Sequence, residues 1–152
     1  MNDVSIVGPA GGEVIELGPA RVRILEDGAT TAHRLGIGEI TLAPHSDGPP
    51  QHRHARHDEG FYVVSGTARF TVGSAVHDAP PGTLVMVPPG VPHSFANPGD
   101  RPVVMLNTFT PDLYVQYFRD LRDATADGQR TTAQAAAEVM GRYSTTVTTD
   151  YA

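Results

Sequence analysis

The chain has 152 residues, a formal net charge of −6, and 39% hydrophobic and 18% charged residues, which is typical of one globular domain with its own core. The negative charge provides no basic surface for nucleic acid or anionic lipid, so we expect neither as a partner. The sequence has no apolar stretch of membrane-spanning length and begins without the basic and apolar regions of a signal peptide. We therefore expect a cytoplasmic protein.

The first 110 residues have the pattern of short β-strands separated by tight turns. Sixteen glycines and thirteen prolines are spread along the chain, which indicates many turns rather than disorder. The predicted strands are 4–7, 13–17, 21–25, 34–42, 60–65, 67–72, 75–78, 83–87, 93–97 and 102–109. Many short strands at this spacing favour an all-β antiparallel sandwich or barrel.

The remainder of the chain is predicted to be helical. Residues 110–112 are Thr-Pro-Asp, with threonine as a helix N-cap, proline at the first helical position and an acid in the first turn. Apolar residues recur at helical spacing over 113–121, and Asp-Gly at 127–128 breaks the pattern. A second, alanine-rich helix is expected over 132–140. The tail 144–152 is expected either to fray or to add an edge strand.

We expect one domain, with residues 1–110 forming the barrel and residues 111–152 forming a helical extension packed on it. Strand edges of a small barrel need cover, which favours a homodimer. The strands of residues 4–25 and the apolar stripe of residues 113–121 offer apolar material for its interface.

Four residues are predicted to hold one divalent metal ion per chain. His52 and His54 are two residues apart, so on a β-strand both imidazoles face the same side. Glu59 follows after a short turn, and His93 comes much later, after Pro-Pro-Gly. Imidazole and carboxylate ligands suit iron, manganese, nickel, cobalt or zinc. The chain has no cysteine, so it offers no thiolate for structural zinc.

These ligands lie inside two sequence blocks that resemble the signature motifs of the cupin superfamily. The first block contains Gly48, His52, His54, Glu59 and Gly66, and the second contains Gly82, Pro88, Pro89, Gly90, His93 and Asn97. The first block departs from the family pattern, because three residues rather than five separate Gly48 from His52. The resemblance covers residues 48–97. Asn97 is expected to hydrogen-bond backbone at the end of its strand.

The resemblance implies a double-stranded β-helix, or jelly-roll, barrel. A barrel followed by two short helices is similar to bacterial quercetin dioxygenase-like monocupins in its general layout. Dioxygenases are common among single-barrel metal cupins. Isomerases, polyketide cyclases, lyases and pure binding modules share the same ligands, so the fold does not fix the reaction.

Strand parity predicts the surroundings of the ion. It places Phe61 and Val63 on the face of Glu59, and Phe95 on the face of His93. These residues, and Met86 in addition, are candidates for the wall of a substrate pocket and equally for plain core packing. Glu59 is the candidate catalytic residue, because it could leave the metal and act as a base.

The other histidines and the intervening arginine are expected to have no direct role. His57 lies in a turn and is expected to face solvent, with a proton-donating role near the site as the alternative. His33, His45 and His77 are expected at the surface. Because side chains alternate along a strand, Arg53 is expected to point away from the ion.

Four protein ligands would leave two positions on an octahedral ion, whereas a tetrahedral zinc shell would be full. We expect a metal-dependent dioxygenase acting on a small aromatic, flavonol-like or enolic substrate, with O₂ as a possible second substrate. The alternatives are a non-oxidative cyclase or isomerase, in which the ion acts as a Lewis acid, and a binding module without turnover. Oxygen consumption would distinguish a dioxygenase from the two alternatives. Any turnover would distinguish a cyclase or isomerase from a binding module.

Overall fold

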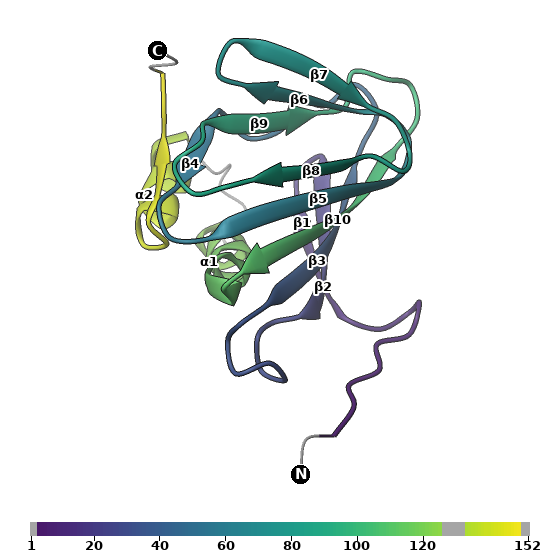
Figure 1. Cartoon of the computed structure of the whole chain (residues 1–152), viewed down its shortest axis with the longest axis vertical. Helices are drawn as coiled ribbons and strands as arrows, with labels where there is room; N and C mark the ends of the chain where they lie inside the picture. Colours follow the sequence, from purple (N-terminus) through teal and green to yellow (C-terminus); the bar gives the residue numbers. More distant parts are fainter. Residues whose placement is uncertain (1–2, 126–132, 150–152) are drawn as a thin grey trace.

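The computed structural model describes residues 3–125 and 133–149 of the chain. Within these residues the strands form two antiparallel sheets that enclose the core (Figure 1). The six-stranded sheet has the order β1-β2-β3-β10-β5-β8, and the five-stranded sheet has the order β11-β4-β9-β6-β7. This arrangement confirms the expected all-β jelly-roll class.

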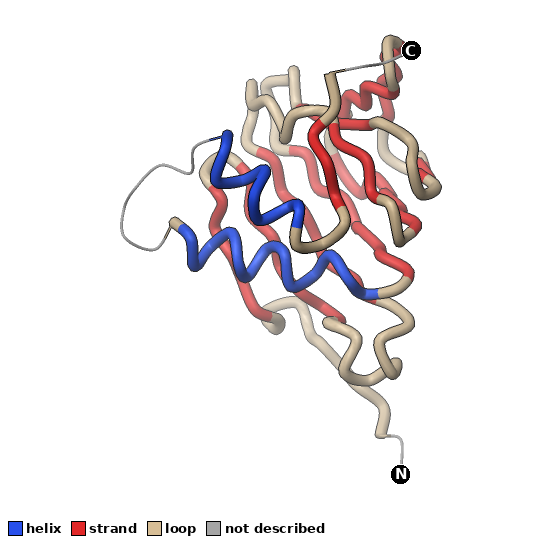
Figure 2. The backbone as a smooth tube through the Cα atoms, turned by 90° about the vertical axis from the view of Figure 1, so that its left-hand side faces the viewer, coloured by secondary structure: helices blue, strands red, loops and turns tan. Residues whose placement is uncertain are grey.

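The strands alternate with short turns along the chain, and the helices follow the tenth strand. The strands are β1 (Glu13–Leu17), β2 (Ala20–Glu26), β3 (Gly36–Leu42), β4 (His52–His54), β5 (Asp58–Ser65), β6 (Ala68–Val72), β7 (Ala75–Ala79), β8 (Leu84–Val87), β9 (His93–Ala96), β10 (Val103–Thr110) and β11 (Thr145–Val147). The helical segments are the 3₁₀ turn η1 (Asp112–Tyr114), α1 (Val115–Ala124) and α2 (Ala133–Gly141). Figure 2 shows α1 and α2 side by side against one side of the barrel. Neither has the length and apolarity needed to traverse a bilayer.

Strand β10 lies between β3 and β5 and builds much of the core. Every second side chain points inward, so Val103, Met105 and Phe109 are fully buried. The same parity buries Asn107, a polar residue, among them. The strand therefore delivers one amide to the interior of an otherwise apolar wall.

Two predictions, a strand over residues 4–7 and a helix N-cap at Thr110, are wrong. Residues 4–7 form no strand, because they pair with no neighbour; Val4 and Ile6 are 85% and 86% exposed on an arm that leaves the barrel (Figure 1). Thr110 is not a helix N-cap, since it ends β10 in register with Asp58 of β5. The helical segment begins at Asp112 without a side-chain cap. The predicted break at 127–128 lies outside the described residues.

The tail adds an edge strand, the second of its two predicted outcomes. Residues of β11 pair antiparallel with β4, with Thr145 opposite His54. The C-terminal extension is therefore part of the barrel's own sheet as well as a helical cover.

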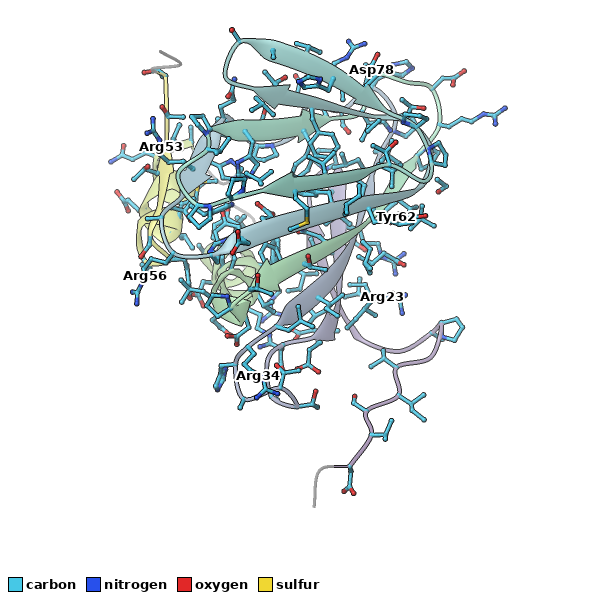
Figure 3. The ribbon with its side chains drawn as sticks, in the orientation of Figure 1. Arg23, Arg34, Arg53, Arg56, Tyr62 and Asp78 are labelled. Carbon is cyan, nitrogen blue, oxygen red and sulfur yellow. The ribbon has the colours of Figure 1, made fainter. Side chains whose placement is uncertain are left out.

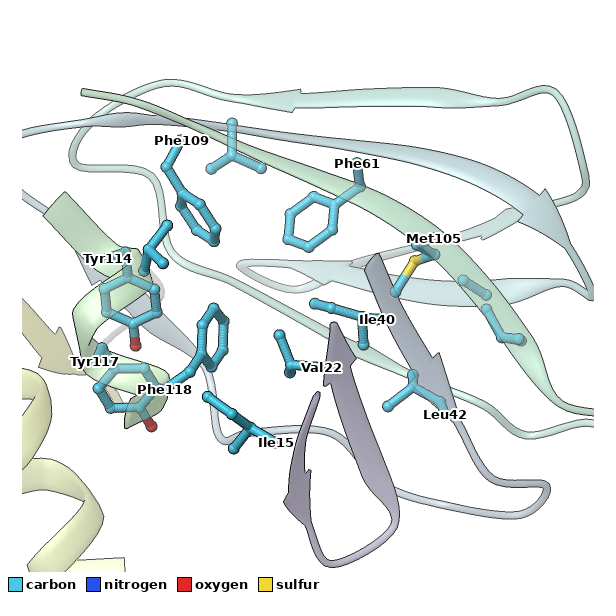
Figure 4. Packing of buried hydrophobic residues seen from close by; sticks show 14 of the residues in the cluster. Ile15, Val22, Ile40, Leu42, Phe61, Met105, Phe109, Tyr114, Tyr117 and Phe118 are labelled. Carbon is cyan, nitrogen blue, oxygen red and sulfur yellow. The ribbon is translucent and has the colours of Figure 1, made fainter. Parts of the chain in front are cut away.

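The apolar stripe of the first helix is used within the chain. Tyr114, Tyr117 and Phe118 are 3–8% exposed and pack towards Ile15 and Val22 of the barrel (Figure 4). Since the central side chains of this stripe are buried, they are not available for the dimer contact suggested by the sequence.

The homodimer remains a prediction, and the structure offers another surface for it. Tyr62, Val64, Leu84 and Met86 are 45–61% exposed on the outer face of β5 and β8, where Tyr62 pairs with Leu84. Figure 3 shows Tyr62 on this face. Neighbouring exposed apolar residues of this kind favour association. We expect light scattering at micromolar concentration to give twice the 16.1 kDa of one chain.

The dimer surface can be tested with one charge. Leu84→Glu should give the mass of one chain at the same concentration, because forming the dimer would bury the new carboxylate at a large cost in free energy. Val76→Glu is the matched control, since Val76 is 58% exposed on β7 of the other sheet. A monomeric parent protein would refute the dimer, and a dimeric Leu84→Glu protein would refute this surface.

Candidate metal centre

The structure brings His52, His54, Glu59 and His93 together inside the barrel. Each residue offers one ligand atom, and these four atoms all lie within 4.8 Å of one another. The four residues are 0–3% exposed. His52 and His93 are paired neighbours on β4 and β9 of the five-stranded sheet, whereas Glu59 comes from β5 of the six-stranded sheet. The site therefore lies between the two sheets.

Backbone carbonyls fix the orientation of two of the imidazoles. Nδ1 of His52 lies 2.9 Å from the carbonyl oxygen of Pro50, and Nδ1 of His93 lies 2.9 Å from that of Val91. A carbonyl oxygen only accepts, so Nδ1 carries the hydrogen in both rings. When Nε2 carries no proton, each ring presents its lone pair to the centre of the site, as a metal ligand must.

Thr145 fixes His54 in the same way. Its Oγ1 lies 2.7 Å from Nδ1 of His54 and donates its own hydrogen to the carbonyl oxygen of Tyr143 at 3.2 Å. The hydroxyl therefore accepts from Nδ1–H of His54, which again leaves Nε2 free. Thr145 belongs to β11, 91 residues after His54, and nothing local in the sequence signals this contact.

The carboxylate of Glu59 completes the donor set. Its Oε2 lies 2.8 Å from Nε2 of His54 and 2.9 Å from Nε2 of His93, and its Oε1 accepts a hydrogen bond from Asn107 at 3.1 Å. Lone pairs on Nε2 and on a carboxylate repel each other unless protons or a cation lie between them. Three neutral imidazoles and one carboxylate leave a dication with a net charge of +1, so these residues fit a divalent metal.

The surroundings favour the protonation state of a metal ligand at His52 and Glu59, whereas at His93 a metal would have to displace a proton. Burial, with the nearby His93, lowers the pKa of His52 from 6.5 to about 4. Burial alone would raise the pKa of Glu59, but hydrogen bonds to His54 and His93 outweigh it and lower that pKa. Burial would lower the pKa of His93, but its hydrogen bond to Glu59 outweighs this and raises it. Near neutral pH, His52 is thus neutral and Glu59 is ionised, as metal ligation requires.

His57 does not face solvent, which corrects the prediction from the sequence. It is 1% exposed, with its ring centroid 4.2 Å from that of His54 and further ring contacts to Phe109 and Tyr114. Neither ring nitrogen has a hydrogen-bond partner among the described residues. Burial lowers its pKa from 6.5 to about 4. The prediction failed because Tyr114, far along the chain, covers this turn.

We expect His57→Leu to stabilise the protein. Unpaired buried polar groups cost about 1–3 kcal/mol each, and leucine has a similar volume without polar atoms. Chemical denaturation should show a rise of roughly 1 kcal/mol or more in the free energy of unfolding. His77→Leu, at an exposed position of β7, should change it little. A clear loss of stability in His57→Leu would mean that the imidazole nitrogens are bonded in solution.

A cavity of about 670 Å³ reaches the site, and His52, Glu59 and Asn107 form part of its lining. Most of the rest of its wall comes from β1–β3, the loop 47–50, and the helices α1 and α2, with Phe95 of β9 and Tyr114 of η1. A Cβ on Gly48 in that loop would lie 1.8 Å from the carbonyl oxygen of Phe95, so this close approach of the loop to β9 requires glycine.

The predicted pocket residues lie in three different places: the cavity wall, the core and the outer surface. Phe95 lines the cavity. Phe61 and Val63 are fully buried in the core, and the Phe61 ring centroid lies 6.3 Å from that of His93. Met86 is 55% exposed, so its place in the pocket wall was wrong. The parity of β8 turns it to the outer face, opposite Gly60.

Other predictions concern residues away from the ion. Arg53 points away from the site and donates to Oγ1 of Thr148, and His33, His45 and His77 are exposed, as expected. The amide of Asn97 donates to backbone carbonyls, including those of Leu42 and Arg101, which confirms its structural role.

The sequence did not indicate four residues that line the cavity or contact the candidate ligands: Asn107, Tyr114, Tyr117 and Thr145. The alternation of β10 could have indicated Asn107 as an inward polar residue. The tyrosines were recognised only as part of an apolar helix stripe. Both line the cavity, their rings stack at 4.3 Å, and burial raises the pKa of Tyr117 to about 12.

Comparison with known proteins agrees with this architecture. A family model described as "Cupin domain" matches residues 38–109. Comparison with curated proteins found no match. The family match over residues 38–109 and the fold together support a single-domain cupin.

Among solved structures, KdgF from Halomonas sp. has a TM-score of 0.63 and 16% identity, covering 72% of this chain and 94% of its own. The polyketide cyclase RemF from Streptomyces resistomycificus has a TM-score of 0.62 and 21% identity, covering 71% and 80%. Oxalate decarboxylase from Bacillus subtilis has a TM-score of 0.58 and 25% identity, covering 71% of this chain and 33% of its own. The first two likenesses are of fold alone.

Proposed function

We propose that this chain is a metal-dependent enzyme that oxidises a small aromatic, flavonol-like or enolic molecule with O₂. The observation that carries the proposal is the continuity of the His52, His54, Glu59 and His93 cluster with a large cavity. When bound, a divalent iron, manganese, nickel or cobalt ion would supply Lewis-acid and redox chemistry, with coordination positions left open by four protein ligands. Zinc is the redox-inactive alternative.

The chain's own residues would position the substrate and handle one proton. Glu59 lines the cavity, so its carboxylate can meet a substrate hydroxyl. Its lowered pKa makes it a weak base, so it accepts a proton only from a hydroxyl made more acidic at the site. Asn107 holds the other carboxylate oxygen at 3.1 Å and so keeps Glu59 oriented. The apolar wall excludes water from the reacting atoms.

We expect turnover to require O₂. Protein purified without chelator or affinity tag would be analysed for metal and then offered a panel of phenols, flavonols and β-dicarbonyls. Product formation in air should be accompanied by oxygen consumption and should stop under anaerobic conditions. Equal rates with and without O₂ would overturn the oxygenase assignment.

A non-oxidative cyclase or isomerase is the second candidate, favoured by the two tyrosines of the cavity wall. Burial raises the pKa of both Tyr114 and Tyr117, so both phenols stay protonated. The two hydroxyls are hydrogen-bonded to each other, which leaves one hydroxyl hydrogen of the pair to donate to an enolate oxygen. Product formation that is independent of O₂ would support this function. Binding of a panel compound without any product would instead support a binding module.

A further inference from the structure

The cavity is polar at its deep end and apolar along its length. Glu59, His52, Asn107 and Tyr114 line the cavity and are 0–3% exposed, so they form its inner, polar end. Much of the remaining wall is built from apolar side chains: Val22, Ile40, Leu42, Phe95, Phe118 and Met140. A ligand that fills this space would therefore have one polar end and an apolar body.

The mouth carries negative charge. Glu16, at the end of β1, and Asp47, in the loop before β4, line the cavity and are exposed. The sequence contains no lysine, and none of the arginines in residues 3–125 and 133–149 lines the cavity. Arg23, Arg53 and Arg56 are seen at the periphery of the molecule (Figure 3). Glu16 is partly balanced by Arg21 at 3.3 Å, which leaves Asp47 as the stronger source of repulsion for an anion.

The size of the cavity exceeds the needs of a single ring. A volume of about 670 Å³ lies in the middle of the roughly 300–1,000 Å³ range of pockets for drug-sized ligands. Ala133 and Ala136 of α2 line the cavity, and a larger side chain at either position would reduce its volume. Ala136 is half-buried, whereas Ala133 is exposed, so Ala136 is better placed to limit the ligand's length.

We propose that the cavity takes an uncharged, flat molecule of two or more rings, which enters with a hydroxyl or carbonyl oxygen leading, and that Ala136 sets its length. This inference rests on the proposed function, because the leading oxygen is assigned to the Glu59 end of the cavity. It adds the charge and size of the substrate and names a specificity residue. Asp47 excludes molecules that carry an anionic group at the trailing end.

Charge selection can be tested by binding alone. The probes are methyl 6-hydroxy-2-naphthoate and 6-hydroxy-2-naphthoate, which share the same rings and leading hydroxyl and differ in charge at the trailing end. Titration calorimetry of the metal-loaded protein under anaerobic conditions should show the ester binding about tenfold or more tightly than the acid. Asp47→Asn should reduce this ratio. Equal affinities, or a preference for the acid, would overturn the charge selection.

Size selection is tested with Ala136→Phe. This variant should weaken binding of the naphthoate ester about tenfold or more while leaving binding of phenol nearly unchanged, because the added ring takes up cavity volume beside α2 that only the larger molecule needs. Glu138→Phe is the matched control, since Glu138 is exposed on the same helix and does not line the cavity. Equal losses for phenol and ester, or the same loss in Glu138→Phe, would overturn the role of Ala136.

The binding measurements and the oxygen measurements can fail separately. Selective ester binding without O₂-dependent product would leave the cavity assignment intact and would refute the oxygenase function. O₂-dependent turnover of single-ring or anionic compounds, without ester binding, would refute the cavity assignment and leave the oxygenase function intact.

Discussion

His54→Ala should abolish metal binding at micromolar protein concentration. The substitution removes one of four ligands and leaves the carboxylate of Glu59 without its 2.8 Å neighbour. Loss of a group that merely orients a ligand costs about 10–100-fold in metal affinity, so loss of a ligand should cost on the order of a hundredfold or more. Elemental analysis of the purified protein should fall from one metal per chain to a small fraction, and competition with a chromophoric chelator would give the affinity.

His77→Ala is the control for this experiment. It removes an imidazole of the same chemistry from an exposed position on β7, so metal content should match the parent protein. Thr145→Val provides an intermediate, because it removes only the hydroxyl that accepts from Nδ1 of His54. Unchanged stoichiometry and affinity in His54→Ala would refute the ligand assignment.

Phe61→Ala should cause the largest loss of stability among the side chains near the site. Phe61 is fully buried, with its ring centroid 5.2 Å from that of Phe70 and 5.3 Å from that of Phe95. Truncation of a buried phenylalanine to alanine costs about 3–5 kcal/mol through lost transfer energy and the cavity left behind. This is a large part of the roughly 5–15 kcal/mol that stabilises a typical domain. Denaturant unfolding of the metal-free protein would measure it.

Val76→Ala is the matched truncation at the surface. Val76 is 58% exposed, so the free energy of unfolding of the Val76→Ala protein should stay within about 0.5 kcal/mol of the parent value. Phe61→Leu should recover part of the stability, because it fills much of the space. A loss in Phe61→Ala no larger than that in Val76→Ala would contradict the packing described for this ring.

The sequence was sufficient where local geometry decides the structure. His52 and His54 share a face because side chains alternate along any strand, and the proline-containing turn before His93 ends one strand and starts the next. The same alternation, with frequent turns, indicated an all-β barrel. The four residues of the candidate centre could therefore be chosen before the structure was known, although their metal binding is still a prediction.

The tertiary structure decided every feature that depends on which distant element covers a residue. Met86 and Phe61 lie on neighbouring strands with similar apolar sequences, yet the pairing of β8 with β5 places one outside and the other in the core. His57 is buried because Tyr114 packs on it, and His54 is oriented by Thr145 at the other end of the chain. Periodicity specifies which side chains share a face, but only long-range packing determines what lies opposite that face.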